Sequence, residues 1–87
     1  MPRYLSLHTL ACMTRQGAQA LVKELSSAPG PVALKRTAWS FVEGKMVAEI
    51  EAPDAEAAAA WLERNSMRPQ WLMRIEYEST DGELKTL

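Results

Sequence analysis

The residue of this chain best suited to acid–base chemistry is His8, its only histidine. A histidine titrates near neutral pH, and one that lies close to a carboxylate can exchange protons or bind a transition metal. Glu49 and Glu76 fall in later strand-like segments, and Arg74 could anchor an anionic group beside them. We therefore predict a ligand site made of His8, Glu49, Arg74 and Glu76. The alternative is that His8 is a hydrogen-bonded structural residue, since no spaced metal motif such as H-E-x-x-H accompanies it.

Soft sulfur ligands form a second candidate site. Cys12 and Met13 follow the first strand-like segment, and Met67 follows the second helical one. In the expected fold these loops emerge at the same end, with Met46 nearby, and thiolate and thioether ligands favour Cu(I). Small metal carriers with such a loop use a Cys-x-x-Cys pair, whereas only Cys12-Met13 stands here. The alternative is that the methionines fill the core.

A strand–helix–strand pattern that occurs twice must position these residues. Thr14 and Asp54 are suited to begin the helices, and Asp81-Gly82 is suited to turn the tail back. The predicted elements are strand 3–10, a helix after Thr14, strand 32–42, strand 46–51, a helix after Asp54 and strand 71–78. We expect one domain, residues 1–87, in which 80–87 form an edge strand or a C-terminal arm.

The order β-α-β-β-α-β indicates the fold class α+β, as a ferredoxin-like sandwich. We expect an antiparallel sheet of order 4-1-3-2 with both helices on one face. Met46, Ala48 and Ile50 should face the helices. The open face should mix polar and charged residues with the apolar residues Tyr4, Val47 and Leu72. The polar and charged residues come from the first, third and fourth strands, namely Ser6, His8, Glu49, Arg74, Glu76 and Glu78.

Composition restricts the partners. Ten Lys and Arg against eleven Asp and Glu give a net charge of −1, which lacks the basic footprint of nucleic-acid binders. The third strand, Met46–Glu51, also lacks the stacking aromatics of RNA-recognition domains. No apolar run is long enough for a membrane span, and the single cysteine, Cys12, cannot form an intramolecular disulfide. We expect no nucleic acid, no membrane and a cytoplasmic location.

The segment 43–57, Glu-Gly-Lys-Met-Val-Ala-Glu-Ile-Glu-Ala-Pro-Asp-Ala-Glu-Ala, resembles small, mostly uncharacterised bacterial ferredoxin-like proteins, some described as nickel-responsive. The opening Met-Pro-Arg-Tyr-Leu is also similar to theirs. This group is similar to the wider dimeric α/β-barrel proteins, which pair their sheets face to face and include ligand binders, monooxygenases and isomerases. The resemblance implies a homodimer and a transition metal, nickel, as a cofactor.

The leading functional hypothesis is therefore a homodimer that binds a small ligand or a metal ion through its open sheet face. One alternative is a small enzyme of the dimeric barrel type, a monooxygenase or an isomerase, in which His8 or a carboxylate acts as general base. Another is a purely structural or regulatory dimer.

Overall fold

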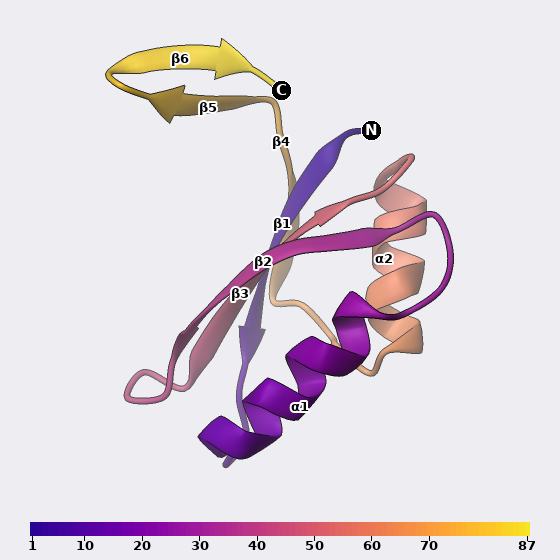
Figure 1. Ribbon diagram of the computed structural model, residues 1–87, viewed down its shortest axis with the longest axis vertical. Helices are drawn as coiled ribbons and strands as arrows, with labels where there is room; N and C mark the ends of the chain where they lie inside the picture. Colours follow the sequence, from indigo (N-terminus) through magenta and orange to yellow (C-terminus); the bar gives the residue numbers. More distant parts are fainter.

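A computed structural model describes residues 1–87, in which two helices pack against one face of a four-stranded sheet (Figure 1). In chain order the elements are β1 (Arg3–Thr9), α1 (Arg15–Ser26), β2 (Ala33–Ser40), β3 (Lys45–Glu51), α2 (Ala55–Arg64), β4 (Trp71–Ile75), β5 (Tyr77–Thr80) and β6 (Glu83–Thr86). None of the helices is both long and apolar enough to cross a membrane.

The main sheet has the order β2-β3-β1-β4, and every neighbouring pair is antiparallel. This is the predicted 4-1-3-2 order read from the other edge, so the ferredoxin-like α+β fold is confirmed. β1 and β3 occupy the centre of the sheet, so the side chains on their two faces determine which residues a site on the sheet can contain.

Both helices begin at the residues that the sequence predicts. The hydroxyl of Thr14 accepts a hydrogen bond from the backbone N–H of Gly17 at 3.0 Å, and a carboxylate oxygen of Asp54 accepts one from Ala57 at 2.7 Å. Such caps satisfy backbone donors that have no partner within the helix. The helices then present Ala18, Leu25, Ala58, Trp61 and Leu62 to the core.

The core lies between the helices and the face of β3 that carries Met46, Ala48 and Ile50, as predicted. The prediction that Ser6 and His8 lie on the opposite, open face is wrong. In the β1–β3 register Ser6 stands opposite Ala48 and His8 opposite Met46. Residues directly opposite in an antiparallel pair share a face, so Ser6 and His8 follow their partners beneath the helices.

The faces of β4 are also inverted relative to the prediction. Arg74 stands opposite Tyr4 and therefore lies on the helix-covered side, whereas Trp71 and Met73 stand opposite Leu7 and Leu5 on the open face. Since the side-chain period of a strand is two, a single wrong choice of face moves every residue of that strand.

The predicted fourth strand ends earlier than expected. β4 stops at Ile75, the chain leaves the main sheet at Glu76, and β5 and β6 form a separate two-stranded sheet. Asp81 and Gly82 connect them with φ angles of 54° and 79°, the positive pair that a tight hairpin turn needs. Residues 80–87 therefore belong to a hairpin that projects from the body on the side away from the helices (Figure 1).

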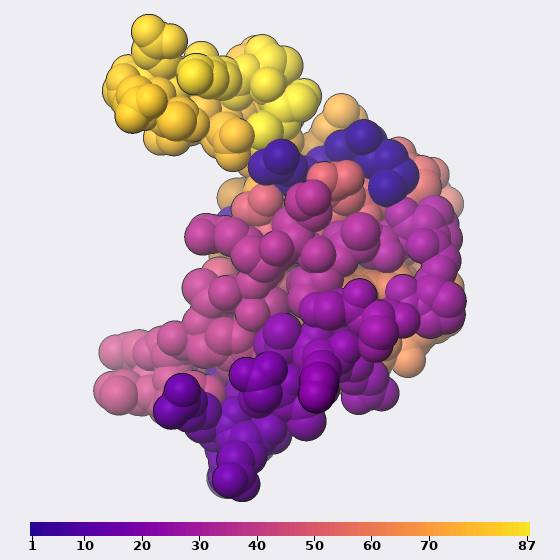
Figure 2. All heavy atoms as spheres, viewed as in Figure 1, coloured from indigo at the N-terminus to yellow at the C-terminus, as the bar shows by residue number.

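The resulting shape is more open than that of a typical domain of this length. The accessible surface is 6036 Å², whereas a compact monomer of this mass exposes about 5,100 Å². The radius of gyration is 13.3 Å, against about 12 Å for a compact chain. Figure 2 shows a hollow between the hairpin and the β2–β3 turn, which accounts for the open shape.

Candidate functional site

The closest contact between two reactive side chains joins Ser6 and His8 on β1. They stand two residues apart, so they point to the same face of the strand. Ser6 Oγ lies 2.7 Å from His8 Nε2 and also 3.5 Å from the carbonyl oxygen of Ala48. A hydroxyl at this distance from an imidazole is the arrangement of an activated nucleophile.

The surroundings of His8 keep its ring neutral. Burial lowers the pKa of His8, and the backbone of Arg68 offsets part of this shift. Nδ1 has no hydrogen-bond partner of good geometry, so no third group orients the ring. A nucleophile–base pair normally has such a third group, which holds the imidazole in one tautomer.

The Ser6–His8 pair is also closed to solvent. The exposed fraction of Ser6 is 0% and that of His8 is 4%. The hydroxyl is therefore out of reach of a substrate in this structure. The arrangement therefore pairs Ser6 Oγ with His8 Nε2 inside the core and favours the structural interpretation of His8.

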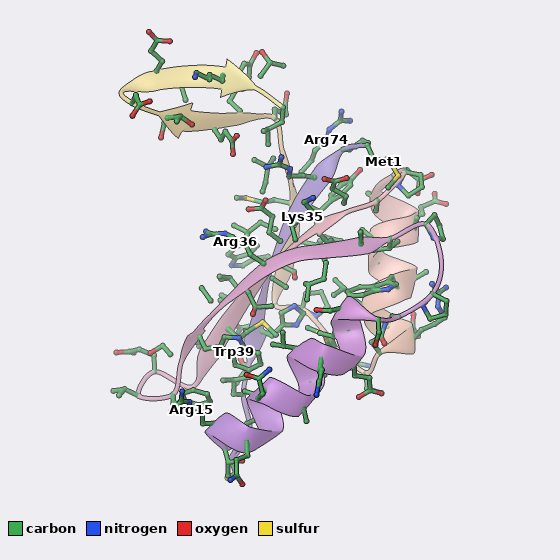
Figure 3. All side chains as sticks on the ribbon, viewed as in Figure 1. Met1, Arg15, Lys35, Arg36, Trp39 and Arg74 are labelled. Atoms are coloured by element: carbon green, nitrogen blue, oxygen red, sulfur yellow. The ribbon has the colours of Figure 1, made fainter.

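The four predicted ligand residues do not converge. His8 lies under the helices, and Glu49 lies on the open face. Arg74 is an exposed residue on the helix-covered side, at the edge strand β4 and near the base of the hairpin (Figure 3). Glu76 lies in the break between β4 and β5, where its carbonyl oxygen accepts a hydrogen bond from the N–H of Leu87.

The predicted sulfur ligands differ in environment. Met67 belongs to the hydrophobic core with 6% exposure, as does Met46 with 2%. Cys12 is exposed, and Met13 is half-buried beside Gly17. No group of three or more His, Cys, Asp or Glu side chains gathers closely enough to hold a metal ion.

A hollow of about 460 Å³ lies at the C-terminal end of α2. Glu63, Met67 and Arg68 are among the residues that line it. Its charged side chains are exposed, and nothing there converges on a single point. A smaller hollow of about 240 Å³ is lined by both β2 and β3 and includes Ala38 and Val47.

The largest unpartnered feature is an apolar patch on the open face of the main sheet. The register places its members side by side on β1, β3 and β4. Trp71 is 41% exposed and Met73 is 50% exposed, and the others are half-buried. We call these residues the open-face patch: Leu5, Leu7, Val47, Trp71, Met73 and Ile75.

A ladder of charges borders the open-face patch. Glu49 lies 3.3 Å from a guanidinium nitrogen of Arg3 and 3.6 Å from one of Arg36, and Glu51 lies 3.1 Å from Lys35 Nζ. The hydrogen bond with Lys35 lowers the pKa of Glu51. A β-bulge between Leu34 and Arg36 lets the two consecutive cations of β2 both reach β3. Figure 3 shows Arg36 pointing away from the helices.

Of the open-face patch only Val47 was predicted, and Tyr4 and Leu72, which were expected beside it, lie on the helix-covered face. The signal for the rest of the patch is nevertheless present in the sequence. Apolar and polar residues alternate along β1, so Leu5 and Leu7 share one face and the more polar Ser6 and His8 share the other. Only the residues of β3 were assigned to the correct faces. If the polar positions of β1 are aligned with the apolar positions of β3, the sequence predicts the patch. This register between two strands cannot be derived from one strand alone.

Fold and surface together define a class: a small ferredoxin-like α+β protein in which helices cover one sheet face and the uncovered face carries an apolar patch bordered by charges. In comparisons with known proteins, no family model, no curated protein and no solved structure matches the chain.

Proposed function

We propose that this chain is a homodimeric binding protein whose two open sheet faces pair and enclose a site for a small apolar ligand. The observation that carries the proposal is the open-face patch. Six apolar residues in contiguous positions of a sheet are unusual on the surface of a monomer, where large apolar patches mark interaction sites.

The size of the exposed surface supports a second copy as the partner. The chain exposes roughly 900 Å² more than a compact monomer of its mass, and a standard interface buries about 800 Å² on each side. An interface between two copies of one chain is usually twofold symmetric, so the same patch would serve on both sides.

The chemistry of the patch favours an apolar ligand over a metal ion. Trp71 and Met73 offer an aromatic and a flexible apolar wall, which suits irregular apolar molecules. The carboxylates Glu49 and Glu51 are already engaged by cations of the ladder. The buried Ser6–His8 pair takes a structural role in this proposal. A reducing, cytoplasmic location is proposed from the single cysteine.

Sedimentation equilibrium of the wild-type protein and Met73→Glu tests the pairing. Met73 is exposed in one chain, so the substitution leaves the monomer folded but places two carboxylates in the proposed interface. We expect a wild-type dimer at micromolar concentration and a dissociation constant at least roughly tenfold higher in the variant. Ala20→Glu, on an exposed position of α1, adds the same charge away from the interface and should leave dimerisation unchanged.

A wild-type protein that is monomeric at micromolar concentration would contradict the proposed pairing. Native mass spectrometry then tests the ligand, first on the purified dimer and then after addition of Ni²⁺ or Zn²⁺. A bound organic mass that Met73→Glu loses supports the apolar site. A stoichiometric metal on the dimer would contradict it and favour the metal hypothesis.

A further inference from the structure

We propose that the β5–β6 hairpin is an arm that packs its apolar side against the main sheet of a second copy. This inference rests on the proposed pairing of open faces and names the segment that holds the pair together. Its first support is position, since the hairpin projects on the open side of the sheet and forms one wall of the hollow (Figures 1 and 2).

The hairpin has little support within its own chain. All eight residues of β5 and β6 are exposed. The ion pair that ties the hairpin to the rest of the chain joins Arg3 and Glu78 at 3.4 Å, whereas the hydrogen bond from Leu87 to Glu76 continues the β5–β6 pairing. A two-stranded hairpin alone in water is marginally stable. A hairpin held away from the body therefore needs a surface to pack against.

The two sides of the hairpin differ in character. In the register Tyr77 stands opposite Thr86 and Ser79 opposite Leu84, so these residues share one side. The other side carries Glu78, Thr80, Glu83 and Lys85. Tyr77 is 58% exposed and Leu84 is 75% exposed, so the side that they share is the one suited to an apolar contact.

Charge favours a copy of this chain as the occupant. Residues 77–87 carry three carboxylates, on Glu78, Asp81 and Glu83, and one amine, on Lys85. The facing edge strand β2 carries two consecutive cations, Lys35 and Arg36, whose side chains remain 44% and 70% exposed although they pair with Glu51 and Glu49. In a twofold pair each acidic arm meets the other chain's cations, and opposite charges at an interface steer and orient association.

Two lysine substitutions in the same hairpin test the arm. Leu84→Lys places a charge on the apolar side, whereas Thr80→Lys places the same charge on the polar side, opposite Glu83. Both positions are exposed in one chain, so both variants should fold, which far-ultraviolet circular dichroism checks. We expect Leu84→Lys to raise the dimer dissociation constant at least roughly tenfold. Thr80→Lys only reduces the negative charge of the arm, so it should raise the dissociation constant by no more than about threefold.

Each remaining outcome overturns a defined claim. If Leu84→Lys dimerises as tightly as the wild type while Met73→Glu does not, the arm is wrong and the pairing of open faces stands. If both lysine variants weaken the dimer equally, the assignment of the apolar side is wrong. A wild-type protein that stays monomeric removes the arm together with the proposed dimer.

Discussion

The two faces of β1 reverse the usual pattern, because polar side chains are buried on one face and apolar side chains are half-exposed on the other. Beneath the helices lie Ser6 and His8, which are polar and buried, next to the buried Tyr4. On the open side lie Leu5 and Leu7, which are apolar and only half-buried. A strand normally turns its apolar side inward. The inversion in β1 leaves apolar side chains on the uncovered face, which is the feature on which the proposed pairing rests.

The central strand β3 sharpens this comparison because its faces behave normally. Ile50 is fully buried under the helices, and Val47 on the open face is half-buried. The helix-covered face should therefore account for most of the stability of one chain, and the open face for association. The predictions below test that division, beginning with the largest expected effect.

Ile50→Ala should lower the free energy of unfolding by about 2–5 kcal/mol, because it removes a fully buried side chain and leaves a cavity. Val47→Ala, on the other face of the same strand, should cost no more than about 1 kcal/mol. Urea unfolding at a concentration that keeps the chain monomeric measures both. Equal costs for the two variants would contradict the division between the faces.

His8 should make stability depend on pH. Burial lowers its pKa below the ordinary value of 6.5, so the unfolded chain takes up a proton first as the pH falls. Stability should be complete above about pH 6.5 and should then decrease by up to about 1.4 kcal/mol per pH unit on acidification. Unfolding measured by circular dichroism between pH 7 and pH 5 checks this slope.

His8→Gln is the matched variant, since it keeps a polar group in the core but does not titrate. It should remove most of the slope between pH 7 and pH 5. Glu51 does not interfere, because its lowered pKa confines its contribution to pH values below its ordinary 4.5. A wild-type protein whose stability is flat over this range would mean that His8 is not buried as a neutral ring.

The elements and their order could be predicted because their signals are local. The caps Thr14 and Asp54 and the Asp81-Gly82 turn depend on residues within one turn of chain, and all three are confirmed. The strand order then follows from the general handedness of such folds, and it too is confirmed.

The faces of β1 and β4 could not be predicted in the same way. Which face of a strand is covered depends on its register with the neighbouring strand, a contact between residues 36 to 48 positions apart for β1 and β3 and 64 to 72 positions apart for β1 and β4. The end of β4 was missed for a related reason. The alternation of Trp71, Met73 and Ile75 continues through Tyr77, although the chain has already left the sheet at Glu76. A period of two marks a strand but does not say to which sheet the strand belongs.

The structure does not bring together His8, Glu49, Arg74 and Glu76, because the faces of β1 and β4 differ from the prediction. A site that draws residues from three strands needs every strand to present the intended side. Two of the three strands were inverted, and Glu76 left the sheet altogether. Only the local part of that hypothesis, that Ser6 and His8 share a face of β1, is confirmed.

The smallest expected effect concerns the charge ladder on the open face. Arg3 forms ion pairs with Glu49, Glu51 and Glu78, but its side chain is 28% exposed, so water and salt screen these contacts. Arg3→Gln should lower the free energy of unfolding by less than about 1 kcal/mol, and the loss should disappear near 1 M salt.

Arg74→Gln is the control for Arg3→Gln, since Arg74 forms no ion pair and is also exposed. Urea unfolding at low and high salt should show a salt-dependent loss for Arg3→Gln and none for Arg74→Gln. A loss of several kcal/mol that persists at high salt would mean that the ladder is a buried structural network. The open face would then contribute to the stability of one chain as the helix-covered face does, and the contrast between the two faces would no longer hold.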